Sequence, residues 1–241
     1  MRALARIISS GLLTIYCAGT FAASLEITPV TVELEASQNG QVFTLHNNGT
    51  EALSAQIRVY SWNQEDGDDQ LTLTRDLIAS PPIAQVAAGG EQIVRLVRAH
   101  PGGPTQEMAY RLFIDELPPP NAAPSTGIQF RFRYSVPVFL YAPGERGAPD
   151  THWSLETHEG KLLLRVRNSG SLHARLSDVS LSVGGNTVPV RAGLLGYALA
   201  GRERVFPLAL SASALRNDGA SVQATVNING KTSTVPVSYA H

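Results

Sequence analysis

The sequence predicts an all-β protein of two sandwich domains in tandem, and three observations support this prediction. Apolar residues alternate with polar ones over short stretches, which is typical of strands that bury one face. Clusters of Gly, Pro, Asn, Asp and Ser separate these stretches, and regular helical periodicity is hard to find. Short strands at this density, roughly seven per hundred residues, favour β-sandwiches of the immunoglobulin type.

The first 22 residues have the composition of a secretory signal peptide. Arg2 and Arg6 form a positively charged start, an apolar run covers Ile7–Ala18, and Thr20-Phe21-Ala22 offers small residues at positions −3 and −1. Cleavage after this motif would remove Cys17, the only cysteine, so the exported chain would contain no disulfide. The apolar run is too short to span a membrane, and we expect an exported, soluble protein.

The charge balance argues against nucleic acid and membrane partners. The chain has 19 Lys and Arg against 20 Asp and Glu, and the signal peptide contains two of these arginines. No stretch reaches the density of basic residues that binding to a nucleic acid requires. After the leader, no stretch approaches the length of apolar sequence that a membrane-spanning helix needs.

The first half contains candidate strands separated by clear turn signals. The predicted strands are Leu25–Ile27, Val30–Leu34, Gln41–His46, Ser54–Trp62, Leu71–Thr74, Gln92–Arg98, Tyr110–Leu117 and Ile128–Leu140. The turn clusters are Ser37–Gly40, Asn47–Gly49, Glu65–Asp69, Ala87–Gly90 and Pro118–Pro124.

At Ala142–Asp150 the composition changes to Gly, Pro and charged residues, which predicts an interdomain linker. We place the N-terminal domain at 23–143, the linker at 144–150 and the C-terminal domain at 151–241. Strands are predicted beyond it at Trp153–Glu156, Lys161–Arg167, Arg175–Val183, Thr187–Val190, Val205–Leu210, Val222–Ile228 and Thr232–Ser238. The halves also share an echo, because QVFTLHNNGTEALSAQIRVYSW and LLLRVRNSGSLHARLSDVSLSV both read strand, Asn-x-Gly turn, strand.

The sequence offers no catalytic or metal-binding constellation. The six histidines are scattered, and no serine lies in a G-x-S-x-G elbow. The acidic stretch Glu65–Asp69 lacks the twelve-residue pattern of a calcium loop, so we interpret it as a hairpin tip. Ala88–Glu91 has no lysine and no following helix, and is therefore a turn and not a phosphate-binding loop. We expect a protein that is not an enzyme and needs neither cofactor nor metal.

The stretch Gly127–Pro143, GIQFRFRYSVPVFLYAP, is the most unusual part of the sequence. Its apolar residues alternate for more than twice the usual strand length of about 5–6 residues. Pro137 cannot donate a backbone hydrogen bond, which places such a strand at a sheet edge or a bulge. Two interpretations stay open: a long core strand of the first sandwich, or an edge strand that lends alternate side chains to a partner by β-augmentation.

Three segments together resemble the PapD-like family of periplasmic pilus chaperones. Ala79–Ile83 with Ala88–Leu96 is similar to the family's Pro-Pro segment, Gly turn and Arg-bearing strand. Glu107–Pro119 keeps the spacing of its Glu-to-Pro-Pro signature, although Phe113 stands where the family usually has a small polar residue. Gly127–Pro143 occupies the place of the family's donor strand.

The resemblance implies two immunoglobulin-like domains with a cleft between them, and a role in the periplasm. Pilus subunits of this pathway lack their last strand, and the chaperone lends its own strand until an outer-membrane usher exchanges it. The implied partners are thus pilus subunits and the usher, and a free chaperone has reason to self-associate over its exposed strand. The implied donor segment contributes Ile128, Phe130, Phe132, Tyr134 and Val136.

The resemblance fails at one important place. Most members hold the subunit's C-terminal carboxylate between two basic residues, and the matching positions here are Pro29 and Pro137. This departure resembles the archaic branch that serves spore-coat-U-type pili. Arginine binds carboxylates through a planar, bidentate fork. The candidate anchors are Arg111, on the strand expected to pair with the donor strand, and Arg95, Arg98, Arg131 and Arg133.

Two other functions compete with this one. A secreted two-domain adhesion or structural module would use the long strand as ordinary core and donate nothing. An exported hydrolase would require a Ser–His pair, which the sequence does not reveal.

Overall fold

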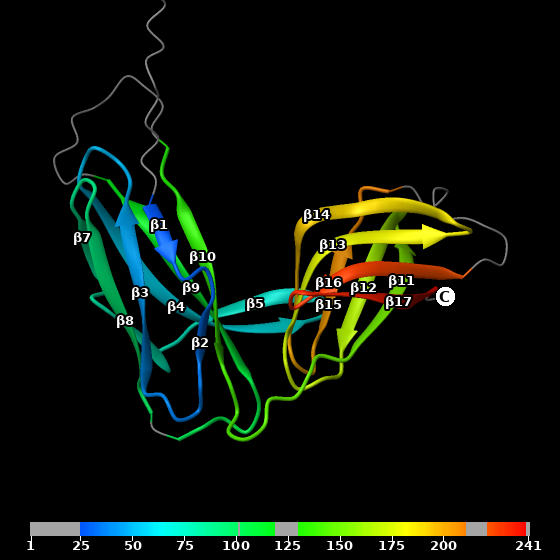
Figure 1. The fold of residues 1–241 in the computed structure, drawn as a ribbon, viewed down its shortest axis with the longest axis horizontal. Helices are drawn as coiled ribbons and strands as arrows, with labels where there is room; N and C mark the ends of the chain where they lie inside the picture. Colours follow the sequence, from blue (N-terminus) through cyan, green and yellow to red (C-terminus); the bar gives the residue numbers. More distant parts are fainter. Residues whose placement is uncertain (1–24, 101, 119–129, 211–220, 240–241) are drawn as a thin grey trace, which may run out of the picture.

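The computed structural model describes residues 25–100, 102–118, 130–210 and 221–239. In these ranges every regular element is a β-strand, so none of them supplies a helix able to cross a membrane. The strands form two separate bodies connected by the chain between Leu140 and Thr151 (Figure 1). The predicted linker, 144–150, falls in this connection, and the predicted signal peptide lies outside the described residues.

The N-terminal sandwich, β1 to β10, consists of two facing sheets (Figure 1). One sheet has the order β1 (Leu25–Thr28), β3 (Gly40–Asn47), β8 (Glu91–Arg98) and β6 (Leu77–Ser80). The other has the order β2 (Val32–Leu34), β10 (Arg133–Leu140), β9 (Met108–Leu117), β4 (Leu53–Glu65) and β5 (Asp68–Leu73), with β7 (Ile83–Val86) beside β4. Alternate residues of both sheets form one apolar core between them, which includes Phe43, Leu45, Leu96, Leu112 and Ile114.

The C-terminal sandwich, β11 to β17, is a single seven-stranded sheet folded over its own core (Figure 1). Its order is β14 (Asn186–Ala198), β13 (Ala174–Val183), β16 (Val222–Ile228), β17 (Lys231–Tyr239), β11 (Thr151–His158), β12 (Lys161–Asn168) and β15 (Glu203–Pro207). The core contains side chains from strands near both edges of this sheet, such as Leu181 of β13 and Phe206 of β15. The predicted all-β fold of two immunoglobulin-like sandwiches is confirmed.

Several elements differ from the sequence prediction; the predicted strand Thr187–Val190, for example, is part of the longer β14. Strands β6 and β7 were not predicted; each is four residues long, and the Pro81-Pro82 pair between them is typical of a turn or loop. The long predicted strand Ile128–Leu140 begins only at Arg133, since Phe130 to Phe132 are described but are not part of the sheet.

The sequence similarity between the two halves corresponds to a buried asparagine that both sandwiches share. Asn47 and Asn168 are both fully buried at the end of a strand. Each donates its side-chain amide to carbonyl groups of neighbouring loops and accepts a hydrogen bond from the backbone N–H of the glycine two residues later. A buried asparagine satisfied in this way fixes the loops around it at one end of each sandwich.

Candidate functional site

Strand β10 lies in two different environments along its length. In its C-terminal part, Val136, Val138 and Leu140 point into the core of the N-terminal sandwich. On the opposite face, Phe139 and Tyr141 are also buried, because they pack in the junction between the two sandwiches. This half of the strand is therefore part of the fold itself.

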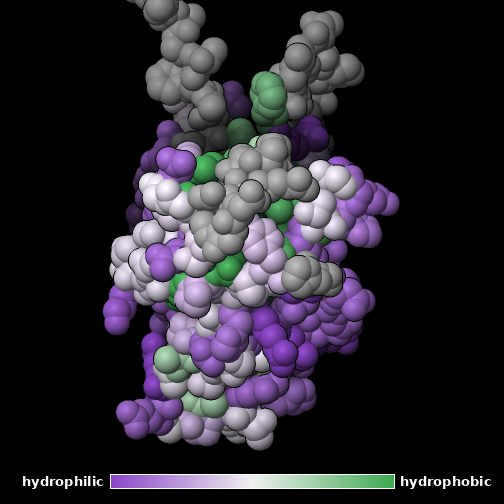
Figure 2. Space-filling model, turned by 90° about the vertical axis from the view of Figure 1, so that its right-hand side faces the viewer, coloured by the Kyte–Doolittle hydropathy of each residue, from purple (hydrophilic) through white to green (hydrophobic). Residues whose placement is uncertain are grey.

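Towards its N-terminal end the same apolar face emerges from the core. Tyr134 is half-buried against the core, Phe132 is 45% exposed and Phe130 is 78% exposed. A hydrophobic group stands out beside strongly hydrophilic ones at the end of the molecule where β10 begins, and the face nearer the viewer is hydrophilic in its lower part and mixed in its upper part (Figure 2). Ile128, the first residue of the predicted donor segment, lies outside the described residues.

Among the predicted donor side chains that the structure describes, Val136 is the most buried. It is 5% exposed and belongs to the core of the N-terminal sandwich. A side chain in this position stabilises the fold and has little surface left for a partner. Within the described part of the predicted donor segment, the apolar surface still available to a partner therefore centres on Phe130 and Phe132.

The start of β10 also presents an open sheet edge. β10 pairs with β9 along its whole length but with β2 only at Val138–Leu140. Among the described residues, no strand pairs with Arg133 to Pro137 on that second side. Unpaired backbone groups at a sheet edge bind another extended chain readily. Pro137 sits at the boundary between the open and the paired part.

The backbone hydrogen bonds show which groups the open edge offers. The carbonyl of Phe132 accepts from the N–H of Glu116 on β9, and the N–H of Tyr141 donates to Leu34 on the β2 side. In an antiparallel pair these directions alternate, so even-numbered residues of β10 face β9 and odd-numbered ones face away. Ser135 therefore directs both its N–H and its C=O toward the open side.

Two acidic residues of β9 hold the root of this segment in place. Glu116 accepts a hydrogen bond from the Tyr134 hydroxyl at 3.0 Å and one from the Phe132 N–H at 3.2 Å. On the other face of the sheet, Asp115 pairs with Arg133 and, at 2.6 Å, with Arg58 of β4. These contacts align the residues at the start of β10 with β9 before any partner binds.

Arg111 lies in the junction between the two sandwiches, directly opposite Pro137 in the register of β9 and β10. The guanidinium carbon is 3.6 Å from the ring centre of Trp62 and 5.2 Å from that of Tyr197 in the C-terminal sandwich. No acidic side chain of the described residues lies within 4.0 Å of it. Burial lowers the pKa of Arg111 from its ordinary value, because desolvation disfavours the cation.

The other four predicted anchors lie elsewhere. Arg95 is exposed on β8, in the sheet that does not contain β10. Arg98, on the same strand, donates to the carbonyls of the loop that precedes β3. Arg133 is paired with Asp115, and Arg131 is exposed ahead of β10. Of the five arginines, only Arg111 packs against both sandwiches.

The junction itself is built around an aromatic cluster and a buried polar pair. Trp62, Phe139 and Tyr197 pack on one another with ring centres 5.4–6.1 Å apart. His173 of the C-terminal sandwich stacks on Phe139, and its ring and backbone nitrogens contact the Glu107 carboxylate at 2.9 Å and 2.8 Å. Such buried, satisfied contacts fix the two sandwiches against each other.

The sequence did not single out these junction residues as a site. Trp62, Tyr197 and His173 lie in ordinary strand or turn contexts, and only the Glu107 signature marked this region in advance. The described residues contain no group of His, Cys, Asp or Glu that could hold a metal ion. Chemically, the open edge at the start of β10 can pair with an extended backbone, and the exposed rings beside it can make apolar contacts. The guanidinium of Arg111 in the junction is suited to an anionic group.

Comparisons with known proteins agree with this geometry. Residues 24–145 match the family model described as pili and flagellar-assembly chaperone, PapD N-terminal domain. No curated protein sequence matches significantly.

Among solved structures, the chain is similar to a chain in the pre-assembly complex of chaperone CsuC and tip adhesion subunit CsuE, from the archaic Csu pili of Acinetobacter baumannii. That match has 26% identity and a TM-score of 0.71, covering 91% of this chain and 100% of that one. The Pseudomonas aeruginosa chaperone CupB2 has the same fold, at 18% identity and a TM-score of 0.58, over 88% of this chain and 98% of that one. A chain in the structure of the Salmonella enterica pilin SafA in complex with the SafB chaperone also has this fold, at 18% identity and a TM-score of 0.61, over 90% of this chain and 96% of that one.

Proposed function

The chain belongs to the PapD-like family of pilus chaperones, and on that premise we propose that it captures incomplete pilus subunits in the periplasm by donating the start of β10. The observation that supports this most strongly is the continuity of one strand face. Val136, Val138 and Leu140 fill this chain's own core, whereas Phe132 and Phe130 extend the same face into solvent beside an open sheet edge.

Strand donation combines two kinds of contact in this position. The outward N–H and C=O groups of β10 pair with a strand of the subunit, and alternate side chains enter its groove. Fully burying one large apolar side chain contributes about 1.5–3 kcal/mol. Ile128, Phe130 and Phe132 together would therefore contribute roughly 5–9 kcal/mol, which is comparable to the whole stability of a small domain. Tyr134 marks the base of the donated segment, because Glu116 and the core already hold it.

Arg111 is the proposed anchor for the subunit's C-terminal carboxylate. It occupies the space beside Pro137, where other family members have a basic residue, and it has no carboxylate partner among the described residues. A partly desolvated arginine gains more from a carboxylate than an exposed one does, because water screens the pair less. Arg111→Ala should reduce the yield of the chaperone–subunit complex, and unchanged yield with a folded chaperone would exclude this role.

The remaining steps follow the pathway of the family. The folding of the captured subunit supplies the free energy, so neither ATP nor a metal is required. An outer-membrane usher receives the complex and replaces β10 by the next subunit's extension. Without a subunit, the open edge favours self-association of the chaperone.

A proline at the open edge tests the donation directly. Ser135→Pro removes the outward N–H of β10 and leaves the pairing with β9 intact, as Pro137 already does two residues later. Ser135→Ala keeps the N–H and serves as the matched control. We expect a pilus subunit co-expressed in the periplasm to co-purify with the alanine variant and to be lost from the proline variant.

Circular dichroism and thermal melting verify that both variants fold. Full capture of the subunit by a folded Ser135→Pro protein would rule out pairing along this edge. It would instead favour a two-domain binding module that donates no strand.

A further inference from the structure

The geometry points to Asp69 as a positioning residue for the Arg111 anchor, itself held by the C-terminal sandwich through Arg204. This inference rests on the proposed role of Arg111 and adds the residues that orient it. It makes the carboxylate site a composite of both sandwiches, with Trp62 as the connecting element.

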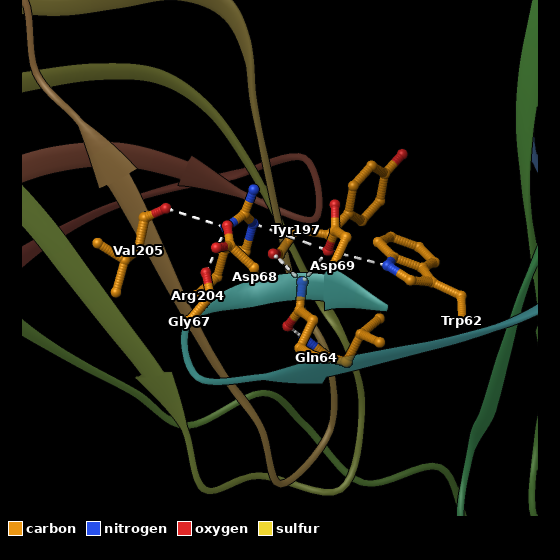
Figure 3. A network of polar contacts seen from close by, with 9 residues as sticks. Trp62, Gln64, Gly67, Asp68, Asp69, Tyr197, Arg204 and Val205 are labelled. Atoms are coloured by element: carbon orange, nitrogen blue, oxygen red, sulfur yellow. Dashed lines mark hydrogen bonds and ion pairs between the residues drawn. The ribbon is translucent and has the colours of Figure 1, made fainter. Parts of the chain in front are cut away.

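Asp69, on the hairpin between β4 and β5, organises a polar network at the junction (Figure 3). Its Oδ1 atom accepts hydrogen bonds from Trp62 Nε1 and from Gln64 Nε2, both at 2.9 Å. The Nε atom of Arg204 lies 3.7 Å from the same oxygen. A charged acceptor shared by several donors gives stronger hydrogen bonds than a neutral one.

The bond to Trp62 fixes the plane on which Arg111 rests. Asp69 holds the indole at its N–H edge, and Tyr197 and Phe139 pack against the rings. The guanidinium of Arg111 lies over the indole face at 3.6 Å, a cation–π contact with the aromatic side chain best suited to it. Asp69 makes no ion pair with Arg111 within 4.0 Å, so its charge acts on the guanidinium only at longer range and leaves the donors of Arg111 available to a ligand.

The C-terminal sandwich reaches the same network from the other side. Arg204 pairs with Asp68 at 2.6 Å and also donates to the carbonyl of Gly67, and the Val205 N–H donates to that carbonyl at 2.9 Å. Gln64 bridges the sandwiches by donating to the Tyr197 carbonyl and accepting from the Leu199 N–H, both at 2.9 Å. The hairpin that carries Asp69 is thereby fastened to the second sandwich, and the orientation of Arg111 depends on that docking.

The test uses the full mature chain and a matched pair of small probes. N-acetyl-phenylalanine has a free carboxylate, and N-acetyl-phenylalaninamide is its neutral counterpart. Binding is followed by the indole N–H signal of Trp62 in nuclear magnetic resonance spectra, which is readily assigned because the chain has two tryptophans. Wild-type protein should bind the acid more tightly than the amide, and Arg111→Ala should lose this difference.

Three variants then isolate the contribution of Asp69. Asp69→Ala should weaken binding of the acid about threefold to tenfold, without a matching effect on the amide. Asp69→Asn keeps an oxygen acceptor for the indole and should restore most of the affinity. Asp68→Ala removes one of the contacts that fasten the hairpin to the C-terminal sandwich but leaves the Trp62 bond intact, so it should weaken binding of the acid less than Asp69→Ala does.

The outcomes separate this inference from the anchor on which it rests. Equal binding of acid and amide by wild-type protein would overturn both. A second outcome would overturn the positioning role alone. In that outcome Arg111→Ala abolishes the preference for the acid, but Asp69→Ala changes this preference no more than Asp68→Ala does. A further loss on adding Asp69→Ala to Arg111→Ala would also contradict it, because Asp69 would then act independently of the anchor.

Discussion

Truncating Phe130 or Phe132 to alanine should weaken subunit capture and leave the chaperone folded. The two rings are 78% and 45% exposed, so folding of the chain uses only part of their apolar surface. The exposed remainder is what a subunit groove can bury. The two substitutions should therefore act on binding, and the substitution of the more exposed ring should have the larger effect.

The size of the effect follows from these exposed fractions. Burying a whole phenylalanine side chain contributes about 1.5–3 kcal/mol. Scaled by exposure, Phe130 has about 1–2.5 kcal/mol still to gain, and Phe132 about 0.7–1.4 kcal/mol. With about 1.4 kcal/mol for each factor of ten, Phe130→Ala should cost roughly 5- to 50-fold and Phe132→Ala roughly 3- to 10-fold in affinity.

Competition for one refolding subunit measures these ratios directly. Equal amounts of wild-type and variant chaperone, distinguished by a tag, are mixed with a denatured pilus subunit, and the two complexes are quantified after dilution. Ile93→Ala is the matched control, because Ile93 is 57% exposed on the sheet that lacks β10. Val136→Ala is the contrasting control and should lower the stability of the free chain by about 1–3 kcal/mol.

Two results would refute the reasoning. Phenylalanine variants that compete as well as wild type would show that these rings do not enter the subunit. Variants that destabilise the free chain as much as Val136→Ala would show that the rings belong to the chain's own core.

Three further predictions concern stability. Burial of Asp115 opposes its ionised form, but hydrogen bonds from its two arginine partners outweigh this and lower its pKa. Its contribution to the free energy of unfolding is therefore fully present above about pH 4 and is lost as the pH falls further. In urea unfolding between pH 7 and pH 2.5, Asp115→Asn should lose stability less steeply towards acid pH than wild type does. Asn168→Ala removes the hydrogen bonds of a fully buried amide and should cost about 2–4 kcal/mol in denaturant unfolding; a cost below about 1 kcal/mol would contradict this. Gly67→Ala places a Cβ 2.5 Å from Val205 at a φ of +80° and should lower the melting temperature clearly more than Gly89→Ala, where φ is +63° and the space is open.

The all-β fold could be predicted because strand alternation is a local property. The predicted strand Val222–Ile228 has the observed bounds, and Lys161–Arg167 falls one residue short of its observed end. The start of β10 could not be predicted in this way. Its alternation continues back beyond Arg133, but the partner strand β9 ends at Leu117 and is followed by Pro118, which has no N–H to donate. Alternation reports which way side chains face, whereas pairing depends on a second strand.

The candidate site was predictable only in part for the same reason. Arg111 could be proposed from the sequence, because it lies on the strand expected beside the donor strand. Its aromatic support could not, since Tyr197 belongs to the other sandwich. Likewise, the Gln64 hydrogen bond to Tyr197 joins positions 133 residues apart, and no local pattern encodes such a contact. Residues fixed by the docking of two sandwiches become visible only in three dimensions.

The divided environment of β10 has a consequence for how this stretch evolves. Residues 136–140 must satisfy this chain's own core and its junction, so their substitutions are constrained by partners within the same gene. Phe130 and Phe132 have few such partners, and their constraints lie outside the chain. Among relatives, the two parts of this short strand should therefore diverge at different rates. Residues 136–140 should covary with other residues of the same chain, and Phe130 and Phe132 should covary with the sequences of the partner. The boundary between these two patterns of divergence should lie between Tyr134 and Val136, where the strand passes into the core.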